Sequence, residues 1–254
     1  MKYVFDHAQS GEEDRLHEMA SLLDTFSRFA IGNIGIGPGA RCIEVGAGNG
    51  SLSKWLAEQV GPDGEVLATD LDLALMDGLE APNLTVAQFD VVNDELPMDQ
   101  PDFIFMRAVV HHLPQRRALI ERFLEWVRPG GYVYLEEPDL TVGLLSEPAT
   151  QAEFFGGFLD WAAANEIDYR TGHQLASWMA AAGFVDIDSE MHTRVYCGGS
   201  TFAQYLSTSI RSLEQHLPPS HIDPALFDEF HRLHADPTYW THPLSFVATV
   251  GRRP

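Results

Sequence analysis

The feature that most constrains the fold of this sequence is the segment at residues 42–51, CIEVGAGNGS, where an apolar run stops at closely spaced glycines. A short apolar run of this kind is typical of a buried strand in a parallel sheet. Residues 51–60 follow with apolar side chains at helical spacing, and residues 65–69 are a second apolar run. The pattern predicts a strand, a glycine loop, a helix and a second strand, and a ligand can approach the loop's backbone N–H groups closely.

Apolar runs continue to alternate with helical patterns along the first half of the chain. We expect strands at residues 84–88, 103–106 and 132–135, and a helix at residues 116–127. Alternation of this kind is typical of an α/β fold with a doubly wound, mostly parallel sheet of the Rossmann-like type.

The C-terminal part of the sequence has a different pattern, in which helical segments rich in aromatic residues separate two late strands. Strands are expected at residues 184–196 and 244–250, which bring the sheet to seven strands and make the last one antiparallel. The helical segments are expected to be lid insertions over the ligand site. Near the N-terminus, Ser10 and Glu13 form a capping-box pattern, which predicts an amphipathic helix that ends near Gly32.

The formal net charge of −21, from 37 acidic and 16 basic residues, argues against anionic partners. Phosphate backbones and anionic membranes would be repelled, so we expect neither nucleic acid nor a membrane as partner, and a small neutral or cationic molecule as substrate. Cys42 and Cys197 are too few for a disulfide framework, and neither a signal peptide nor a membrane span is evident. These features predict a cytoplasmic protein, and no metal site is expected.

The acidic residues behind the glycine loop narrow the ligand further. Asp70 ends the second expected strand, where a carboxylate can accept hydrogen bonds from both hydroxyls of a ribose. Together with VLATD at 66–70, QFDV at 88–91, PDFIF at 101–105 and RPGG at 128–131, the chain resembles class I S-adenosylmethionine-dependent methyltransferases. The stretch HHLP at 111–114 is similar to the small-molecule methyltransferases of quinone and secondary-metabolite pathways.

The resemblance implies that S-adenosylmethionine is the cofactor, S-adenosylhomocysteine the product, and a small molecule, such as a secondary metabolite, the methyl acceptor. It implies one methyltransferase domain over residues 1–254, divided as follows: an N-terminal helical lid at 1–37, a cofactor-binding core at 38–139, lid insertions at 140–171 and 198–240, and the remaining sheet at 172–197 and 241–254. The cofactor-binding residues it implies are Gly46, Ala47, Gly48 and the backbone near Arg107 for the methionine part, Asp70 for the ribose, Asp90, Leu71 and Val91 for the adenine, and Glu44 in support of the loop.

Candidate catalytic and substrate-binding residues follow from their chemistry. A histidine near its reference pKa suits a general base at neutral pH, so His111 and then His112 are the first candidates, with Asp139 or Glu137 as orienting or alternative bases. Glu137, Phe158 and Trp161 are candidates for substrate binding. The alternatives are that a histidine only packs, that Asp90 only caps a turn, and that the acidic residues after the fifth strand only add surface charge.

Other functions fit parts of the same pattern. A NAD-dependent oxidoreductase would also use Asp70, but the third glycine of its fingerprint would fall at Ser51. A methyltransferase-like cyclase would keep the cofactor without transferring its methyl group. A non-enzymatic binding module would leave the aromatic lid unexplained. The oligomeric state stays open, with a homodimer through the lid helices as one outcome.

Overall fold

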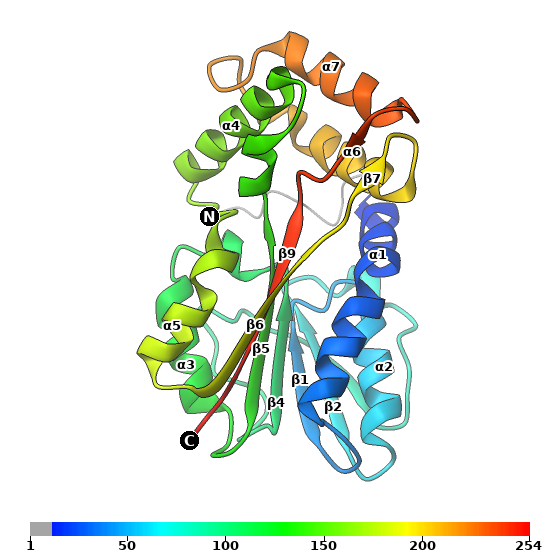
Figure 1. The fold of residues 1–254 in the computed structure, drawn as a ribbon. Coiled ribbons are helices and arrows are strands. Elements are labelled where there is room, and N and C mark those ends of the chain that lie inside the picture. Colours follow the sequence, from blue (N-terminus) through cyan, green and yellow to red (C-terminus); the bar gives the residue numbers. More distant parts are fainter. Residues whose placement is uncertain (1–11) are drawn as a thin grey trace.

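The computed structural model describes residues 12–254, in which a seven-stranded sheet has helices on both faces (Figure 1). The strand order is β3-β2-β1-β4-β5-β9-β6. The strands β1 to β5 are parallel, and β9 pairs antiparallel with both β5 and β6. This confirms the predicted fold class. The strands are β1 (Arg41–Val45), β2 (Glu65–Asp70), β3 (Leu84–Gln88), β4 (Phe103–Arg107), β5 (Tyr132–Asp139), β6 (Val185–Thr193) and β9 (Ser245–Arg252).

Two sequence-based strand boundaries were wrong. β5 does not end at Leu135 but continues to Asp139, because β9 pairs with it along its whole length, from Tyr132 opposite Arg252 to Asp139 opposite Ser245. The late strand expected at residues 184–196 is broken after Thr193. Its last part is β7 (Tyr196–Cys197), which pairs with β8 (Trp240–Thr241) in a separate two-stranded sheet.

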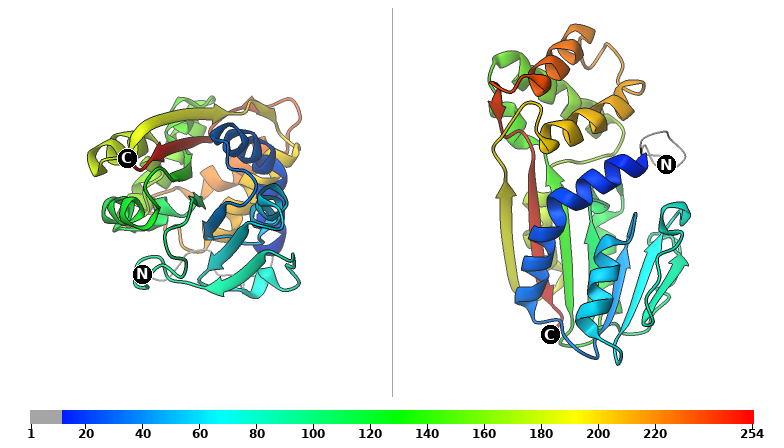
Figure 2. Two further views of the ribbon diagram at one scale, coloured as in Figure 1. Left: turned by 90° about the horizontal axis from the view of Figure 1, so that it is seen from below. Right: turned by 90° about the vertical axis from the view of Figure 1, so that its right-hand side faces the viewer.

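The helices on the two faces bury separate apolar layers (Figures 1 and 2). On one face, α1 (Glu12–Ile34) and α2 (Ser51–Val60) contribute Ile31, Leu52 and Leu56 to one hydrophobic cluster. On the other face, α3 (Arg116–Trp126) and α5 (Leu175–Ala182) contribute Phe123 and Met179 to another. The central strand β4 is buried at all five positions, as expected for a parallel strand covered on both faces, whereas the edge strand β3 is only partly buried.

The start of α1 cannot be compared with the sequence-based expectation. Ser10 of the expected capping box lies outside the described residues, and the helix ends at Ile34 rather than near Gly32. None of the helices within residues 12–254 combines the length and the apolar composition that a bilayer-crossing segment needs.

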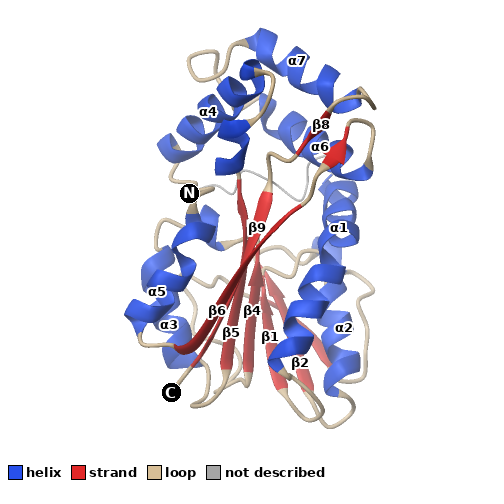
Figure 3. Cartoon of the chain, viewed as in Figure 1, coloured by secondary structure: helices blue, strands red, loops and turns tan. Residues whose placement is uncertain are grey.

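A helical cap lies above one end of the sheet, as Figure 3 shows. It consists of α4 (Ala149–Ala164), α6 (Thr201–Glu214) and α7 (Pro224–Ala235), which share one hydrophobic cluster. Phe154 of α4 stacks on Phe230 of α7 with ring centroids 4.5 Å apart, and meets Phe227 edge to face at 5.4 Å. The short 3-10 helix η3 (Thr141–Leu145) precedes α4, and η4 (Thr171–Gln174) follows it. Two others lie at the sheet: η1 (Ala74–Met76) after β2 and η2 (Val110–His112) after β4.

The edge strand β6 is one surface through which two copies of the chain could pair in a homodimer. Its side chains are largely exposed and include Asp186, Asp188 and Glu190. Asp186 pairs with Arg252 of β9 at 2.6 Å, and exposed charged side chains along an edge strand are a usual protection against pairing with another chain. The homodimer therefore stays a prediction.

His234 makes the cap sensitive to acid. The ring is buried, with Nδ1 2.9 Å from the Phe230 carbonyl oxygen and Nε2 3.2 Å from the Tyr196 hydroxyl, so one neutral tautomer satisfies both nitrogens. Burial lowers its pKa to about 4, whereas an unfolded histidine titrates near about 6.5. The unfolded state therefore binds the proton first, and this contribution to stability is lost as the pH falls from about 6.5 towards 4.

We predict that His234→Gln makes the free energy of unfolding less dependent on pH between about 6.5 and 4, because one proton-binding group of the unfolded chain is removed. Urea unfolding at a series of pH values measures this. The exposed His216 is the control, and His216→Gln should leave the slope unchanged. Equal slopes for wild type and His234→Gln would contradict the assignment.

Candidate active site

A cavity of about 330 Å³ lies between the sheet and the cap. The carboxyl ends of parallel strands meet at one edge, where open α/β sheets bind ligands. The cavity is accordingly lined from β1, β2, β4 and β5 below and from α1, α4 and α6 around it. Its lining includes all the residues predicted to bind cofactor, with His111, His112 and Phe158: Glu44, Gly46, Ala47, Gly48, Asp70, Leu71, Asp90, Val91 and Arg107.

The glycine loop after β1 has a backbone that other residues would not tolerate. Gly46, Gly48 and Gly50 have φ angles of 74°, 57° and 71°. A Cβ atom on Gly46 would lie 2.4 Å from a methyl carbon of Val109, so the loop and the segment after β4 could not approach as closely. The Gly46 and Ala47 N–H groups both donate to the Thr69 carbonyl, which holds the loop against the end of β2. The loop is therefore a fixed, open cradle at the cavity.

Asp70 and Leu71 lie where β2 ends at the cavity. One oxygen of Asp70 accepts the Gly48 N–H at 2.9 Å, so the carboxylate and the glycine loop are held in register. The Leu71 side chain is 53% exposed although it borders the cavity. An exposed apolar side chain beside an acidic one suits a ligand with a flat ring next to hydroxyl groups.

Asp90 caps a turn and also lines the cavity. Its carboxylate accepts the backbone N–H of Val92 at 2.9 Å and the side-chain amide of Asn93 at 2.7 Å. Burial raises the pKa of Asp90, but these hydrogen bonds outweigh burial, and the pKa lies below its usual value. The capping alternative is thus observed, and the position at the cavity leaves the cofactor role as a prediction.

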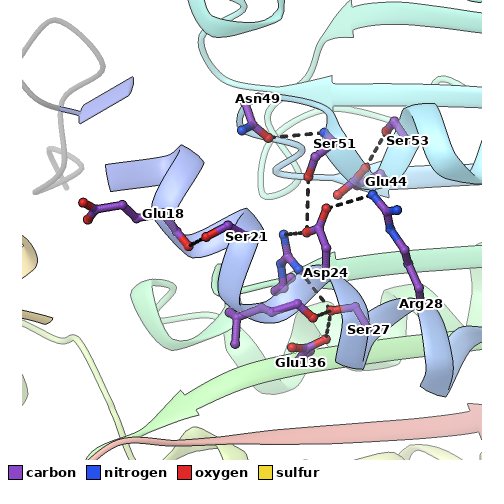
Figure 4. A network of polar contacts seen from close by, with 12 residues as sticks. Glu18, Ser21, Asp24, Ser27, Arg28, Glu44, Asn49, Ser51, Ser53 and Glu136 are labelled. Carbon is purple, nitrogen blue, oxygen red and sulfur yellow. Dashed lines mark hydrogen bonds and ion pairs between the residues drawn. The ribbon is translucent and has the colours of Figure 1, made fainter. Parts of the chain in front are cut away.

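The Arg107 side chain has a role that the sequence did not indicate. Its guanidinium, at the end of β4, donates to Asp24 at 3.0 Å and to the Ser27 hydroxyl at 3.0 Å, both on α1. Ser27 in turn donates to Glu136 of β5 at 2.6 Å, and the Tyr134 hydroxyl donates to the same oxygen at 3.1 Å. Figure 4 shows Asp24, Ser27 and Glu136 in this network. The network fastens α1 to the sheet.

The same network reaches the glycine loop and the start of α2. Ser51 donates to Asp24 at 3.3 Å, and Ser53 makes a short hydrogen bond to Glu44 (Figure 4). Burial raises the pKa of Glu44 to about 7, with Ser53 and Arg107 acting against it. Because Leu16 of α1 is the nearest neighbour of Gly48, at 3.6 Å from where a Cβ would lie, docking of α1 closes one side of the cradle.

His111 is held by a buried carboxylate. Its Nδ1 lies 2.6 Å from Oε2 of Glu137, whose carboxylate also accepts the backbone N–H groups of Val109, Val110 and His111. Burial raises the pKa of Glu137 to about 7, and these N–H donors oppose the rise. Burial also lowers the pKa of His111 to about 3, so the imidazole is neutral at pH 7 and the near-reference pKa expected from the sequence was wrong. When Glu137 is ionised, the His111 proton lies on Nδ1, and Nε2 is the ring nitrogen that Glu137 does not contact.

Glu137, Asp139 and Trp161 do not line the cavity, which corrects their predicted direct roles. Glu137 and Asp139 are buried within β5 instead of following it, so they are not part of a negatively charged surface. Asp139 accepts from the Thr141 N–H at 2.8 Å and makes a short contact with His173. Trp161 is buried in the cap, with its ring 5.6 Å from that of Phe158. Phe158 alone of the predicted substrate residues borders the cavity.

Many of the lining residues that the sequence did not single out lie on two helices. Arg15, Leu16 and Met19 of α1 line the cavity, as does a stripe along α6. The stripe is Tyr205, Leu206, Ser209, Ile210 and Leu213. Its helical spacing is visible in the sequence, but the same spacing fits any packed helix face. Within residues 12–254, no group of three or more His, Cys, Asp or Glu side chains could hold a metal ion.

Comparison with known proteins identifies the family. A family model described as a methyltransferase domain matches residues 12–189. This chain belongs to that methyltransferase domain family. It is 27% identical over 149 residues to methyltransferase str3 of Strobilurus tenacellus, covering 57% of this chain and 53% of that protein. It is 28% identical over 153 residues to a ubiquinone biosynthesis O-methyltransferase of Xylella fastidiosa, covering 57% of this chain and 61% of that protein.

The chain thus spans a little over half the length of these curated relatives. The fold is similar to that of phosphoethanolamine N-methyltransferase 2 of Haemonchus contortus, solved with phosphomonomethylethanolamine and S-adenosylhomocysteine. The TM-score is 0.56 at 18% identity, over 86% of this chain and 49% of the other. At this identity the similarity establishes a shared fold.

We predict that Arg107→Met lowers the free energy of unfolding by about 3 kcal/mol, because the partly buried Asp24 loses its ion pair and the buried Glu136 loses a nearby cation. Urea unfolding measures this. The exposed pair of Arg41 and Glu65, 3.2 Å apart, is the control, and Arg41→Met should cost less than about 1 kcal/mol. Equal losses for the two variants would contradict a structural role for the Arg107 network.

Proposed function

We propose that this protein transfers a methyl group from S-adenosylmethionine to a small-molecule acceptor, such as a secondary metabolite. One observation carries the proposal: a single cavity contains the glycine loop with Asp70 at one end, aromatic cap residues at the other, and the paired His111 in its wall. Membership of the methyltransferase domain family supports it.

The cofactor end of the cavity suits a cationic nucleoside. Asp70 would accept from the ribose hydroxyls, Leu71 and Val91 would flank the adenine, and Asp90 would accept from its amino group. The loop from Gly46 to Gly48 and the backbone at Arg107 would approach the methionine part, with Glu44 in support. Three carboxylates border this end of the cavity with one guanidinium group, a balance that favours a cation: Asp70, Asp72 and Asp90 against Arg107.

When bound, S-adenosylmethionine supplies an activated methyl group on a sulfonium, whose sulfur keeps the electron pair as the new bond to the acceptor forms. The protein's part is to align the acceptor and exclude water. Residues of α1 and of the cap helices α4 and α6 line the cavity and would border the bound acceptor.

His111 is the proposed general base for a hydroxyl or amine acceptor. Glu137 fixes the ring and holds the proton on Nδ1, so Nε2 can accept the acceptor's proton. His112 also borders the cavity, with its ring 3.8 Å from that of His111, and is the second candidate. Asp139 contacts His173 and does not line the cavity, so it is not proposed as a base.

The cofactor assignment predicts that S-adenosylhomocysteine binds and that NAD does not. Asp70→Asn should weaken S-adenosylhomocysteine binding at least tenfold, because a hydrogen bond to a charged acceptor is lost. Asp63 lies on an exposed turn outside the cavity, so Asp63→Asn is the matched control and should bind as wild type. Isothermal titration calorimetry measures all three. Binding of NAD without S-adenosylhomocysteine would instead indicate an oxidoreductase.

The base assignment predicts that His111→Gln lowers kcat by roughly 10²–10⁴, the usual range for a general base, while S-adenosylhomocysteine affinity stays unchanged. His173 has the same type of carboxylate partner but lies outside the cavity, so His173→Gln should retain near-normal kcat. S-adenosylhomocysteine release is measured with the best acceptor from a panel of phenols and hydroquinones. A near-normal rate for His111→Gln removes this residue from the mechanism, and product formed without S-adenosylhomocysteine favours a cyclase.

A further inference from the structure

The end of the cavity under the cap has a different chemistry from the cofactor end. Its side chains belong to the single hydrophobic cluster of the cap, whereas the cofactor end is built on the clusters of the sheet. The lining residues from the cap cluster are Leu140, Phe158, Tyr169, Tyr205, Leu206, Ile210, Leu213, Leu244 and Phe246. If the proposed function holds, this end receives the methyl acceptor.

Few side chains that line this end of the cavity carry a charge. Among the described residues, Arg15 is the only lining side chain there with a fixed charge, and it already interacts within the protein. His111 and His112 are neutral, because burial lowers the pKa of both. An ammonium group on the acceptor would therefore lose its hydration without gaining a counter-charge, and a phosphate or carboxylate would find only Arg15, which already interacts within the protein.

Ser209 is a polar residue in this largely apolar wall, which also contains the tyrosines Tyr169 and Tyr205. It lies in the cavity-lining stripe of α6, is more than nine-tenths buried, and its hydroxyl has no hydrogen-bond partner within the described structure. The neighbouring serines of α6 differ: Ser212 donates to the Ser209 carbonyl at 2.8 Å, and Ser207 pairs with His231 at 2.7 Å. A buried unpaired hydroxyl is costly, and a ligand group that pairs with it would recover that cost.

We propose that the acceptor is a neutral, largely apolar ring compound and that Ser209 determines its specificity by pairing with a polar substituent. The apolar wall supplies most of the contact area. Because the Ser209 hydroxyl oxygen is covered in this structure, the pairing requires the side chain to turn towards the cavity, where it selects molecules that carry a hydrogen-bonding group at that position.

Charge preference is tested with three probes that share one ring system: 2-naphthol, 2-naphthyl phosphate and 2-naphthylmethylammonium. Binding to the full chain is followed by fluorescence, with and without saturating S-adenosylhomocysteine. We expect 2-naphthol to bind with a stoichiometry of one and at least tenfold more tightly than either charged probe. Equal or tighter binding of the phosphate or the ammonium would overturn the neutral-acceptor proposal.

The role of Ser209 is tested by a cycle of 2-naphthol and naphthalene against wild type and Ser209→Ala. The variant should weaken 2-naphthol about fivefold, the usual effect of one neutral hydrogen bond, and leave naphthalene within twofold. Ser212→Ala, on the same helix but outside the lining, should change neither affinity. An equal effect on both probes, or none on 2-naphthol, would overturn the assignment of Ser209.

The two proposals can fail separately. S-adenosylhomocysteine binding is measured without any acceptor, so its absence counts against the proposed function alone. The naphthalene series is also measured on protein without cofactor, and its outcome decides the acceptor class on its own. Preserved S-adenosylhomocysteine binding together with a preference for a charged probe would keep methyl transfer and reject the neutral acceptor.

Discussion

Burial of three carboxyl groups at the end of β5 makes hydrogen bonds to them valuable, and their partners position the elements around the cavity, although one oxygen of Glu136 has no partner among the described residues. Glu136 is bonded through Ser27 to α1 and Arg107, Glu137 caps η2 and binds His111, and Asp139 binds Thr141 at η3 and His173 at η4. These side chains are buried because β9 pairs along the whole of β5 and covers its end. One strand end therefore holds three separate parts of the site in place.

The arrangement separates two tasks within one cavity. The sheet and the glycine loop supply backbone groups and carboxylates that suit a polar, cationic ligand, while the cap supplies aromatic and aliphatic side chains. His111 lies in the wall of the same cavity, held by the sheet through Glu137 and in ring contact with Tyr169 at 4.8 Å. A catalytic group fixed by the rigid sheet can act on different acceptors when the cap changes, which accounts for the range of reactions that such folds support.

The sequence was sufficient for the parts of the site whose signals are local. Glycine punctuation, apolar runs and an acidic residue at a strand end indicate the loop, Asp70 and Asp90, and the structure places these residues around one cavity. The fold class followed from the alternation of strand and helix patterns. The end of β5 was missed because EEPD is a polar stretch, and it becomes a strand only through its pairing with β9, more than a hundred residues later.

What the sequence determined by itself is the sheet, the glycine loop and the acidic residues at the strand ends, because hydrophobic periodicity and glycine conformation act over short distances along the chain. Only the tertiary structure decided that Arg107 fastens α1, that Glu137 orients His111 while Asp139 serves His173, and that Ser209 borders the cavity. These partners are 26 to 83 residues apart in the sequence. No local pattern encodes such pairs, because they depend on which buried polar groups the folded chain must satisfy.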